Sequence, residues 1–212
     1  MQILISIIFL IIFRHKFTFL RERGPTLKKL FHKKITQIMN KIKSIFRLLN
    51  IKKRADIVWK DLIKLHKEAK WHFGQFDINK HIETSFHDQD GSIIKFNYRI
   101  THDDLLFNAI ILQSFNEDFT NDIMVLASHF NGLLNFGKVI VNLKYNYIEF
   151  EYSRDLVTYM VYPGKIHTDI SVHYNLTIDC IWAFSTLLET GDNPVFVISE
   201  FLKRKKDNKK QK

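Results

Sequence analysis

The segment from Gly137 to Pro163 constrains the fold more than any other part of the chain, because strand-forming residues fill almost all of it. Tight turns divide it into three predicted strands, at residues 138–143, 146–152 and 156–162. The first two strands alternate between apolar and polar residues, which is typical of strands that bury one face. The predicted core set of these two strands is Val139, Val141, Leu143, Ile148, Phe150 and Tyr152.

The other side of this predicted meander is mixed in polarity, since apolar side chains occur there beside Asn142, Glu149 and Glu151. The third strand carries apolar residues on both sides. We therefore expect a partner-binding surface that includes Ile140, Tyr147, Leu156, Met160 and Tyr162. This surface could be covered by the chain's own N-terminal helix, by a second copy of the chain, or by a client protein.

Period-two and continuously apolar patterns predict three more strands earlier in the chain, at residues 76–86, 94–100 and 105–115. Helical spacing predicts helices at residues 54–73, 120–134 and 170–188, and the first of these should stop at Gly74. Asp192 or Asn193 is expected to cap a last helix that begins at Pro194. The predicted order is α-βββ-α-βββ-α-α. Hairpin-length connections make the sheet antiparallel, so the fold class is α+β, with helices packed on the sheet.

An amphipathic and strongly basic helix is predicted before this domain, from Thr26 to Asn50. Such a helix is typical of a membrane-surface element or of a partner-binding helix, although it could also dock on its own domain with its lysines in water. The apolar run at residues 3–13 is shorter than the roughly 20 residues of a spanning helix. It is a weak anchor, an interfacial segment, or the result of an upstream start. The candidate membrane or partner contacts on the helix are Leu27, Leu30, Phe31, Ile35, Ile38, Ile42, Phe46, Lys33, Lys34 and Lys41.

Charge divides the chain into three parts. Residues 14–54 hold 14 Lys or Arg and one acidic residue, and residues 202–212 hold seven Lys or Arg and one Asp. The interval between them holds 11 basic and 20 acidic residues, although the whole chain has a formal net charge of +10. We therefore predict an N-terminal segment at 1–53, an acidic domain at 54–202 and a basic flexible tail at 203–212. The acidic domain is a poor candidate for a nucleic-acid surface, whereas the basic extensions could contact anionic lipid, nucleic acid or an acidic partner.

Two stretches, "LASHFNGLLNFGKVIVNLKYNYIEFEY" (Leu126 to Tyr152) and "LLETGDNPVFVISEFL" (Leu187 to Leu202), carry a resemblance to known proteins. In this pattern, a helix with an asparagine near its end leads into a strand pair, and a late helix leads into another near a proline. The pattern resembles the YbjN family and the type III secretion chaperones, including the Tir-chaperone group, over residues 55–201. The resemblance implies a bacterial, non-enzymatic protein-binding module, chaperone-like or regulatory, that commonly forms a homodimer.

The sequence contains no pattern that is typical of a catalytic, metal or cofactor site. The loop that begins at Asp88 resembles a calcium loop only in its first residues, because its twelfth position is Arg99 rather than a glutamate. The single cysteine, Cys180, lies on an apolar helical stripe and is expected to be a buried thiol. We therefore predict no enzyme activity and no cofactor. The expected location is the cytoplasm, either free or at the inner face of the membrane. The expected partner is a protein client or a second copy of the chain.

Overall fold

The computed structural model describes residues 50–88 and 91–210, and residues 51–212 belong to one compact unit. The predicted basic helix, its candidate contact residues and the apolar run lie outside the described residues. The helices are α3 (Ile51–Glu68), the 3-10 helix η1 (Glu117–Phe119), α4 (Thr120–Leu133), α5 (Leu156–Val161), α6 (Lys165–Thr190) and α7 (Pro194–Lys210). The strands are β1 (Phe73–Phe76), β2 (His81–His87), β3 (Ile93–Ile100), β4 (Asp104–Leu112), β5 (Lys138–Asn142) and β6 (Tyr147–Asp155).

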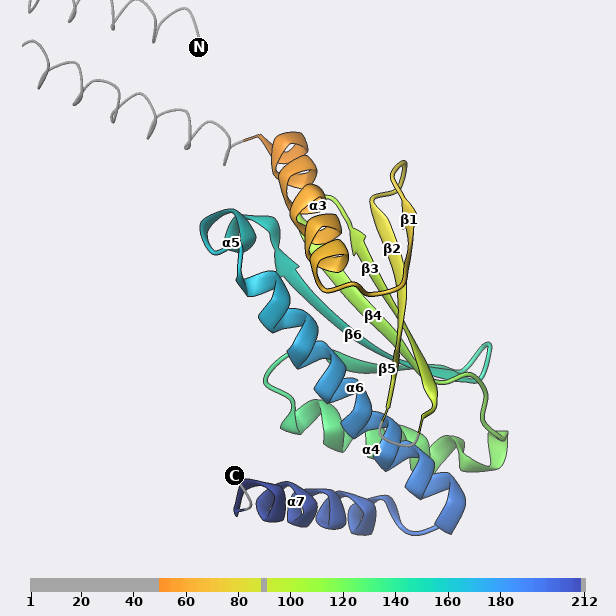
Figure 1. Ribbon diagram of the computed structural model, residues 1–212. Coiled ribbons are helices and arrows are strands. Elements are labelled where there is room, and N and C mark those ends of the chain that lie inside the picture. The colour runs from red at the N-terminus through yellow and green to blue at the C-terminus, as the bar shows by residue number, and fades with distance from the viewer. Residues whose placement is uncertain (1–49, 89–90, 211–212) are drawn as a thin grey trace, which may run out of the picture. The chain divides into compact units, whose positions relative to one another are not determined.

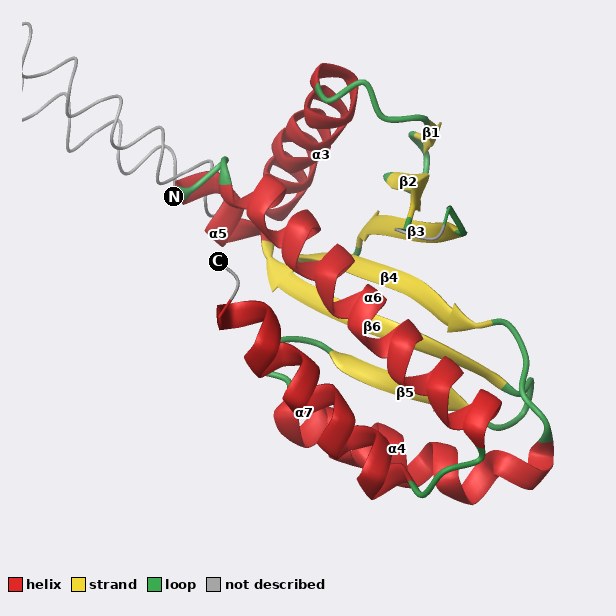
Figure 2. Ribbon diagram, turned by 60° about the horizontal axis from the view of Figure 1, so that its bottom comes forward, coloured by secondary structure: helices red, strands yellow, loops and turns green. Residues whose placement is uncertain are grey.

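The six strands form one antiparallel sheet in the order β1-β2-β3-β4-β6-β5 (Figures 1 and 2). Hairpins join β1 to β2, β2 to β3, β3 to β4 and β5 to β6. The connection from β4 through α4 to β5 skips one position in the sheet, and β6 fills that position. The predicted α+β class with an antiparallel sheet is therefore confirmed.

Helices cover one face of the sheet, and α6 runs across the strands (Figure 2). The core between them is rich in aromatic side chains, including Phe96, Phe107 and Phe150 from the sheet and Phe184 from α6, all fully buried. Cys180 is also fully buried in this core, as predicted. Burial of this apolar area is the dominant stabilising contribution to a domain of this size.

The first predicted strand is two strands in the structure. A turn at residues 77–80 separates β1 from β2, and Lys80 adopts a left-handed backbone with φ of 45°. Asp77 stabilises this turn, because its Oδ1 accepts hydrogen bonds from the Trp59 indole at 3.0 Å and from the Gln75 amide at 2.7 Å. Four strands therefore precede α4, and two follow it.

The third strand predicted for the meander, at 156–162, is wrong. This segment is the helix α5, and Asp155 caps it by accepting hydrogen bonds from the Thr158 backbone and hydroxyl at 2.8 and 2.7 Å. Leu156 and Tyr159 are buried three residues apart, which is helical spacing. Leu143 is also misplaced in the predicted core, because it lies in the β5–β6 turn and is exposed.

The ends of two helices also differ from prediction. The helix α3 ends at Glu68 rather than at Gly74, since Lys70 turns the chain with a left-handed φ of 57°. The start of α7 at Pro194 is as predicted, and the Asn193 side chain accepts a hydrogen bond from the Val195 backbone at 2.9 Å. Instead of a flexible tail from residue 203, α7 continues to Lys210. Contacts with α6 stabilise this C-terminal part of α7. Lys205 pairs with Asp179, and the Arg204 guanidinium lies 5.0 Å from the Trp182 ring centre.

Candidate functional site

The candidate site is the sheet face opposite the core, which we call the open face. Side chains alternate across a strand, so the residues between the buried ones point to this face. No described helix lies across it (Figure 1). It is formed by the exposed and half-buried alternate positions of the strands, including His81, Glu83, Ser85, Lys95, Asn97, Arg99, Leu106, Asn108, Ile110, Lys138, Ile140, Tyr147, Glu149 and Glu151.

The strand registers align these side chains into rows that cross the sheet. One row of paired residues runs through all six strands, and it consists of Lys138, Glu151, Asn108, Asn97, Glu83 and Gly74. A neighbouring row runs through five strands and consists of Ser153, Leu106, Arg99, His81 and Phe76. The open face therefore carries donors, acceptors and both signs of charge on the five strands from β2 to β6, and the two rows are interrupted only at Gly74, Leu106 and Phe76.

Several of these side chains hold one another in place. Lys138 Nζ lies 3.1 Å from Glu151 Oε1, and the Asn108 amide donates to Glu149 Oε2 at 2.8 Å. His81 Nε2 lies 3.3 Å from Asn97 Oδ1. Such cross-strand pairs stabilise a sheet only modestly, by about 0.2–1 kcal/mol each. Their larger effect is to orient polar groups toward the space in front of the sheet.

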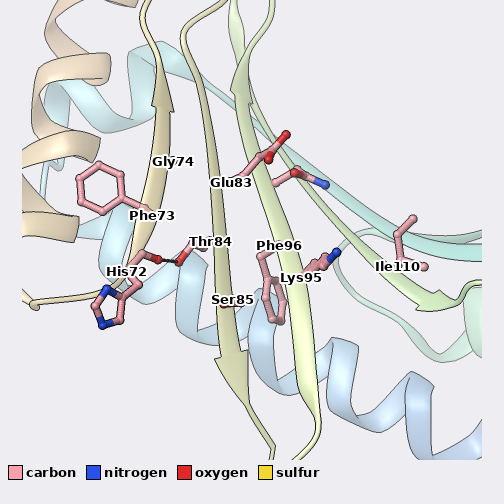
Figure 3. Close-up of a pocket in the computed structure, with 10 residues that line it drawn as sticks. His72, Phe73, Gly74, Glu83, Thr84, Ser85, Lys95, Phe96 and Ile110 are labelled. Carbon is pink, nitrogen blue, oxygen red and sulfur yellow. Dashed lines mark hydrogen bonds between the residues drawn. The ribbon is translucent and has the colours of Figure 1, made fainter.

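The open face is hollowed rather than flat. A hollow of about 350 Å³ lies over the rows, between His81, Glu83, Asn108 and Glu151. A larger hollow of about 680 Å³ adjoins it and shares Glu83 and Asn97 with it. Figure 3 shows that its lining residues spread over neighbouring strands from Gly74 to Ile110. Both volumes lie in the range of ordinary ligand or side-chain pockets, roughly 300–1,000 Å³.

The structure places the predicted partner contacts in different environments. Ile140 and Tyr147 lie half-buried on the open face. Leu156 is fully buried and Met160 packs against the core, so neither is a surface contact, because α5 turns them inward. Tyr162 is exposed, but it follows α5 and lies outside the sheet.

The polar residues of β2, β3 and β4 on the open face were not predicted as site residues. The alternation of these strands already separates them from the core set. The alternation does not reveal which strands are neighbours in the sheet. The β4–β6 pairing places Asn108 beside Glu151 although 43 positions separate them in the sequence. Polar residues from both halves of the chain therefore meet on one surface.

A second polar cluster lies under the far end of β6, around Asp169, which is only 2% exposed. The Tyr159 hydroxyl donates to its carboxylate at 2.9 Å, Lys165 Nζ lies at 3.1 Å and Arg154 Nε at 2.7 Å. Burial, with the Asp169 charge as a second cause, raises the pKa of Tyr152 beside this cluster to about 12. The protonated Tyr152 cannot act as a base at neutral pH. Paired charges join β6 to α6 in this cluster, and the Tyr159 hydrogen bond joins α5 to α6.

The described part of the chain offers neither a cluster of metal ligands nor a membrane-spanning helix. Within residues 50–88 and 91–210, no group of three or more His, Cys, Asp or Glu side chains is placed to hold a metal ion. No helix of the same part combines the length and the apolar character that crossing a bilayer requires.

Comparison with known proteins concerns the fold alone. No protein-family model and no curated protein matches the sequence. Among solved structures, the chain is similar to the crystal structure of YbjN from E. coli, with 11% sequence identity and a TM-score of 0.47. The match covers 61% of this chain and 93% of that chain. A similarity at this level concerns a YbjN-like arrangement of helices and strands, and it assigns the chain neither to the YbjN family nor to the type III secretion chaperones.

Proposed function

We propose that this chain is a non-enzymatic protein-binding module, chaperone-like or regulatory, which holds a polypeptide partner against its open face. The observation that carries the proposal is the face itself. The described helices leave it uncovered, two hollows deepen it, and a row of paired polar residues crosses the five strands from β5 to β2 and ends at Gly74 on β1. A partner strand or helix would find hydrogen-bonding groups there, with Ile110, Ile140 and Tyr147 as apolar contacts.

The same surface is too mixed for simpler ligands. Glutamates lie beside lysine and arginine along the rows, so the face presents no uniform positive field for phosphates. A partner with alternating charge and small apolar side chains suits it better. That partner is a client protein or a second copy of this chain.

Site-specific photo-crosslinking tests this proposal in cells that express the full chain. A photoreactive residue at position 110, on the open face, is expected to give discrete crosslinked species. The same residue at position 122, which is exposed on α4, serves as the matched control and should give none. Glu151→Lys, which reverses one charge of the long row, should weaken the crosslinks from position 110.

The outcomes separate the two partners. Two differently tagged copies of the chain reveal whether a crosslinked species is a homodimer. Equal patterns at positions 110 and 122, or no species at either, would contradict binding through the open face.

A second candidate function rests on the sequence of the N-terminal segment. Its lysines alternate with apolar residues from Thr26 to Asn50, a pattern typical of helices that bind anionic membranes. Each lysine near an anionic surface contributes about 1 kcal/mol. The full chain should therefore float with phosphatidylserine vesicles, and deletion of residues 1–50 should abolish flotation. Flotation that survives the deletion would reject this function.

Nucleic-acid association is a weaker alternative. Its support is the same basic segment together with the lysines after Leu202, and the acidic interval between them opposes it.

A further inference from the structure

A separate pocket of about 390 Å³ lies on the helix side of the sheet, where the end of β2 meets α6 and the loop after α3. Aromatic rings dominate its lining, which includes Trp71, Phe86, Tyr174, Ile170, His87 and Asn175. None of the residues of the long polar row belongs to it. It is therefore a site distinct from the open face, and binding there does not depend on the function proposed for that face.

The aromatic walls of this pocket are fixed by their neighbours. The Trp71 ring meets Phe86 edge-on at 5.0 Å between ring centres, and it stacks with His167 at 6.4 Å. Phe86 in turn meets Tyr174 edge-on at 5.8 Å. Trp71, Phe86 and Tyr174 are all half-buried, so part of each ring still faces water. A rigid apolar wall loses little conformational entropy when it binds.

The polar groups of the pocket restrict what it can accept. The Tyr174 hydroxyl already donates to the His87 carbonyl at 3.0 Å, and the Ser171 hydroxyl donates to the His167 carbonyl at 3.0 Å. No carboxylate, lysine or arginine lines the pocket, so a charged group would enter without a counter-ion. The exposed Asn175 amide remains to pair with a ligand. Such an amide can serve one backbone N–H and one C=O, as Asn131 does for Val139 in this domain.

We infer that this pocket binds an aromatic side chain of a polypeptide, with the ring against Trp71, Phe86 and Tyr174. The fully apolar end of a phenylalanine ring fits against Ile170, which is buried at the base. The backbone of the same residue pairs with the Asn175 amide at the rim. Aromatic anchors of this kind dominate the energetics of many protein interfaces.

The test uses the isotope-labelled full chain and N-acetyl-L-phenylalaninamide as the probe. The chain has three tryptophans, so its indole N–H groups give three separate NMR signals, and Trp71→Phe assigns one of them. The Trp71 signal should shift saturably with the probe. The signals of Trp59, whose indole is bonded to Asp77, and of Trp182, which lies under Arg204, are internal controls that should stay in place.

Two variants on α6 separate pocket binding from surface adhesion. Ser171→Phe fills the pocket rim and should weaken binding of the probe at least about tenfold. Thr168→Phe adds the same ring at an exposed position one turn earlier and should leave the affinity unchanged. Unshifted Trp59 and Trp182 signals show that each variant is folded.

A further pair of measurements identifies the source of the ring. Benzyl alcohol supplies an aromatic ring without a peptide backbone and should bind more weakly than the probe, and Asn175→Ala should remove most of that difference. Equal affinities of the two ligands for the unaltered chain would overturn the polypeptide assignment. The site itself is rejected if Trp71 does not respond, if all three indoles shift together, or if Ser171→Phe binds the probe normally.

Discussion

Buried polar atoms without hydrogen-bond partners gather around one tyrosine in the core. The Tyr98 ring lies 5.6 Å from the His66 ring and 6.1 Å from the His173 ring, and all three residues are fully buried. Among the described residues, Tyr98 Oη, His66 Nε2 and both nitrogens of His173 meet no hydrogen-bond geometry. Leaving such groups unpaired costs about 1–3 kcal/mol each. The core therefore contains polar groups that oppose its own stability.

His173 makes this cost dependent on pH. Burial lowers its pKa to about 3, and the nearby Phe150 backbone offsets only part of that effect. The unfolded chain, with an ordinary histidine pKa near 6.5, binds the proton more readily than the folded chain does between these values. The free energy of unfolding is therefore unaffected by His173 above about pH 6.5. Protonation of this residue in the unfolded chain lowers it by about 1.4 kcal/mol per pH unit as the pH drops toward 3.

Replacing this histidine should remove the pH dependence that it causes. Between about pH 6 and about pH 4.5, the free energy of unfolding of His173→Phe should fall by about 2 kcal/mol less than that of the unaltered chain. Urea unfolding at each pH measures this difference. His129→Phe, on the exposed side of α4, is the control and should follow the unaltered chain. Identical pH profiles for His173→Phe and the unaltered chain would show that His173 is not a source of acid sensitivity.

Gly137 forms the turn from α4 into β5, and no other residue fits there. Its φ is +75°, and an added Cβ would lie 2.6 Å from Phe150 Cζ and 2.7 Å from the Glu151 carbonyl oxygen. Gly191 has a similar φ of +65° at the end of α6, but an added Cβ there meets nothing within 4 Å. The two glycines therefore separate the cost of backbone strain from the cost of a clash.

Gly137→Ala should destabilise the domain by about 3 kcal/mol or more, because strain and overlap add. Gly191→Ala should cost only about 1 kcal/mol, the strain alone. Thermal or urea unfolding of both variants measures the difference. Equal losses would mean that the β5–β6 hairpin shifts to make room for the methyl group.

At the scale of elements, a side chain pairs with the outer edge of the sheet at one residue of β5, Val139. The Asn131 amide donates to the Val139 carbonyl at 3.0 Å and accepts from the Val139 N–H at 2.7 Å, as a neighbouring strand would. Unpaired edges invite pairing with other chains. Asn131, near the end of α4, therefore has a structural role in this chain.

Asn131→Ala should destabilise the domain by about 1–3 kcal/mol, because two backbone groups of β5 lose their partner. It should also increase self-association, which analytical ultracentrifugation can measure. Asn135→Ala, at a position just after α4, is the control and should change neither quantity. A variant that keeps its stability would show that water replaces the amide at this edge.

At the scale of the whole molecule, the buried core of the described part comes entirely from residues 51–210. Its members extend from Val58 on α3 to Phe201 on α7. By their contacts, residues 51–212 form one compact unit. Residues 51–210 therefore assemble a continuous core among themselves.

Deletion of residues 1–50 should consequently leave a domain that unfolds cooperatively in urea. The dependence of its unfolding free energy on urea should stay in the range of a small two-state protein, about 1–3 kcal/mol per molar urea. Circular dichroism should show the helix and strand content of the described part. A truncated chain without a cooperative transition would mean that the N-terminal segment completes the fold.

Much of the fold was predictable from local and periodic features of the sequence. Period-two alternation identified Phe96, Phe150 and several other inward residues, and the Asn193–Pro194 pair marked the start of α7. The α+β class followed from the order of such segments. These predictions need only the residues adjacent in the sequence and the period of the apolar pattern, and both can be read from the sequence.

The sequence by itself therefore determined the core faces, the antiparallel class and the separation of basic and acidic parts. The tertiary structure decided the rest. Residues 156–162 have strand-forming composition, yet the Asp155 cap and the burial of Leu156 and Tyr159 make the segment helical. The order of strands brings Asn108 beside Glu151 and creates the open face. The strand order depends on partners far apart in the sequence, whose pairing energies no local pattern contains. The helix depends on a local cap and on burial in the core, which together outweigh the strand-forming composition of the segment.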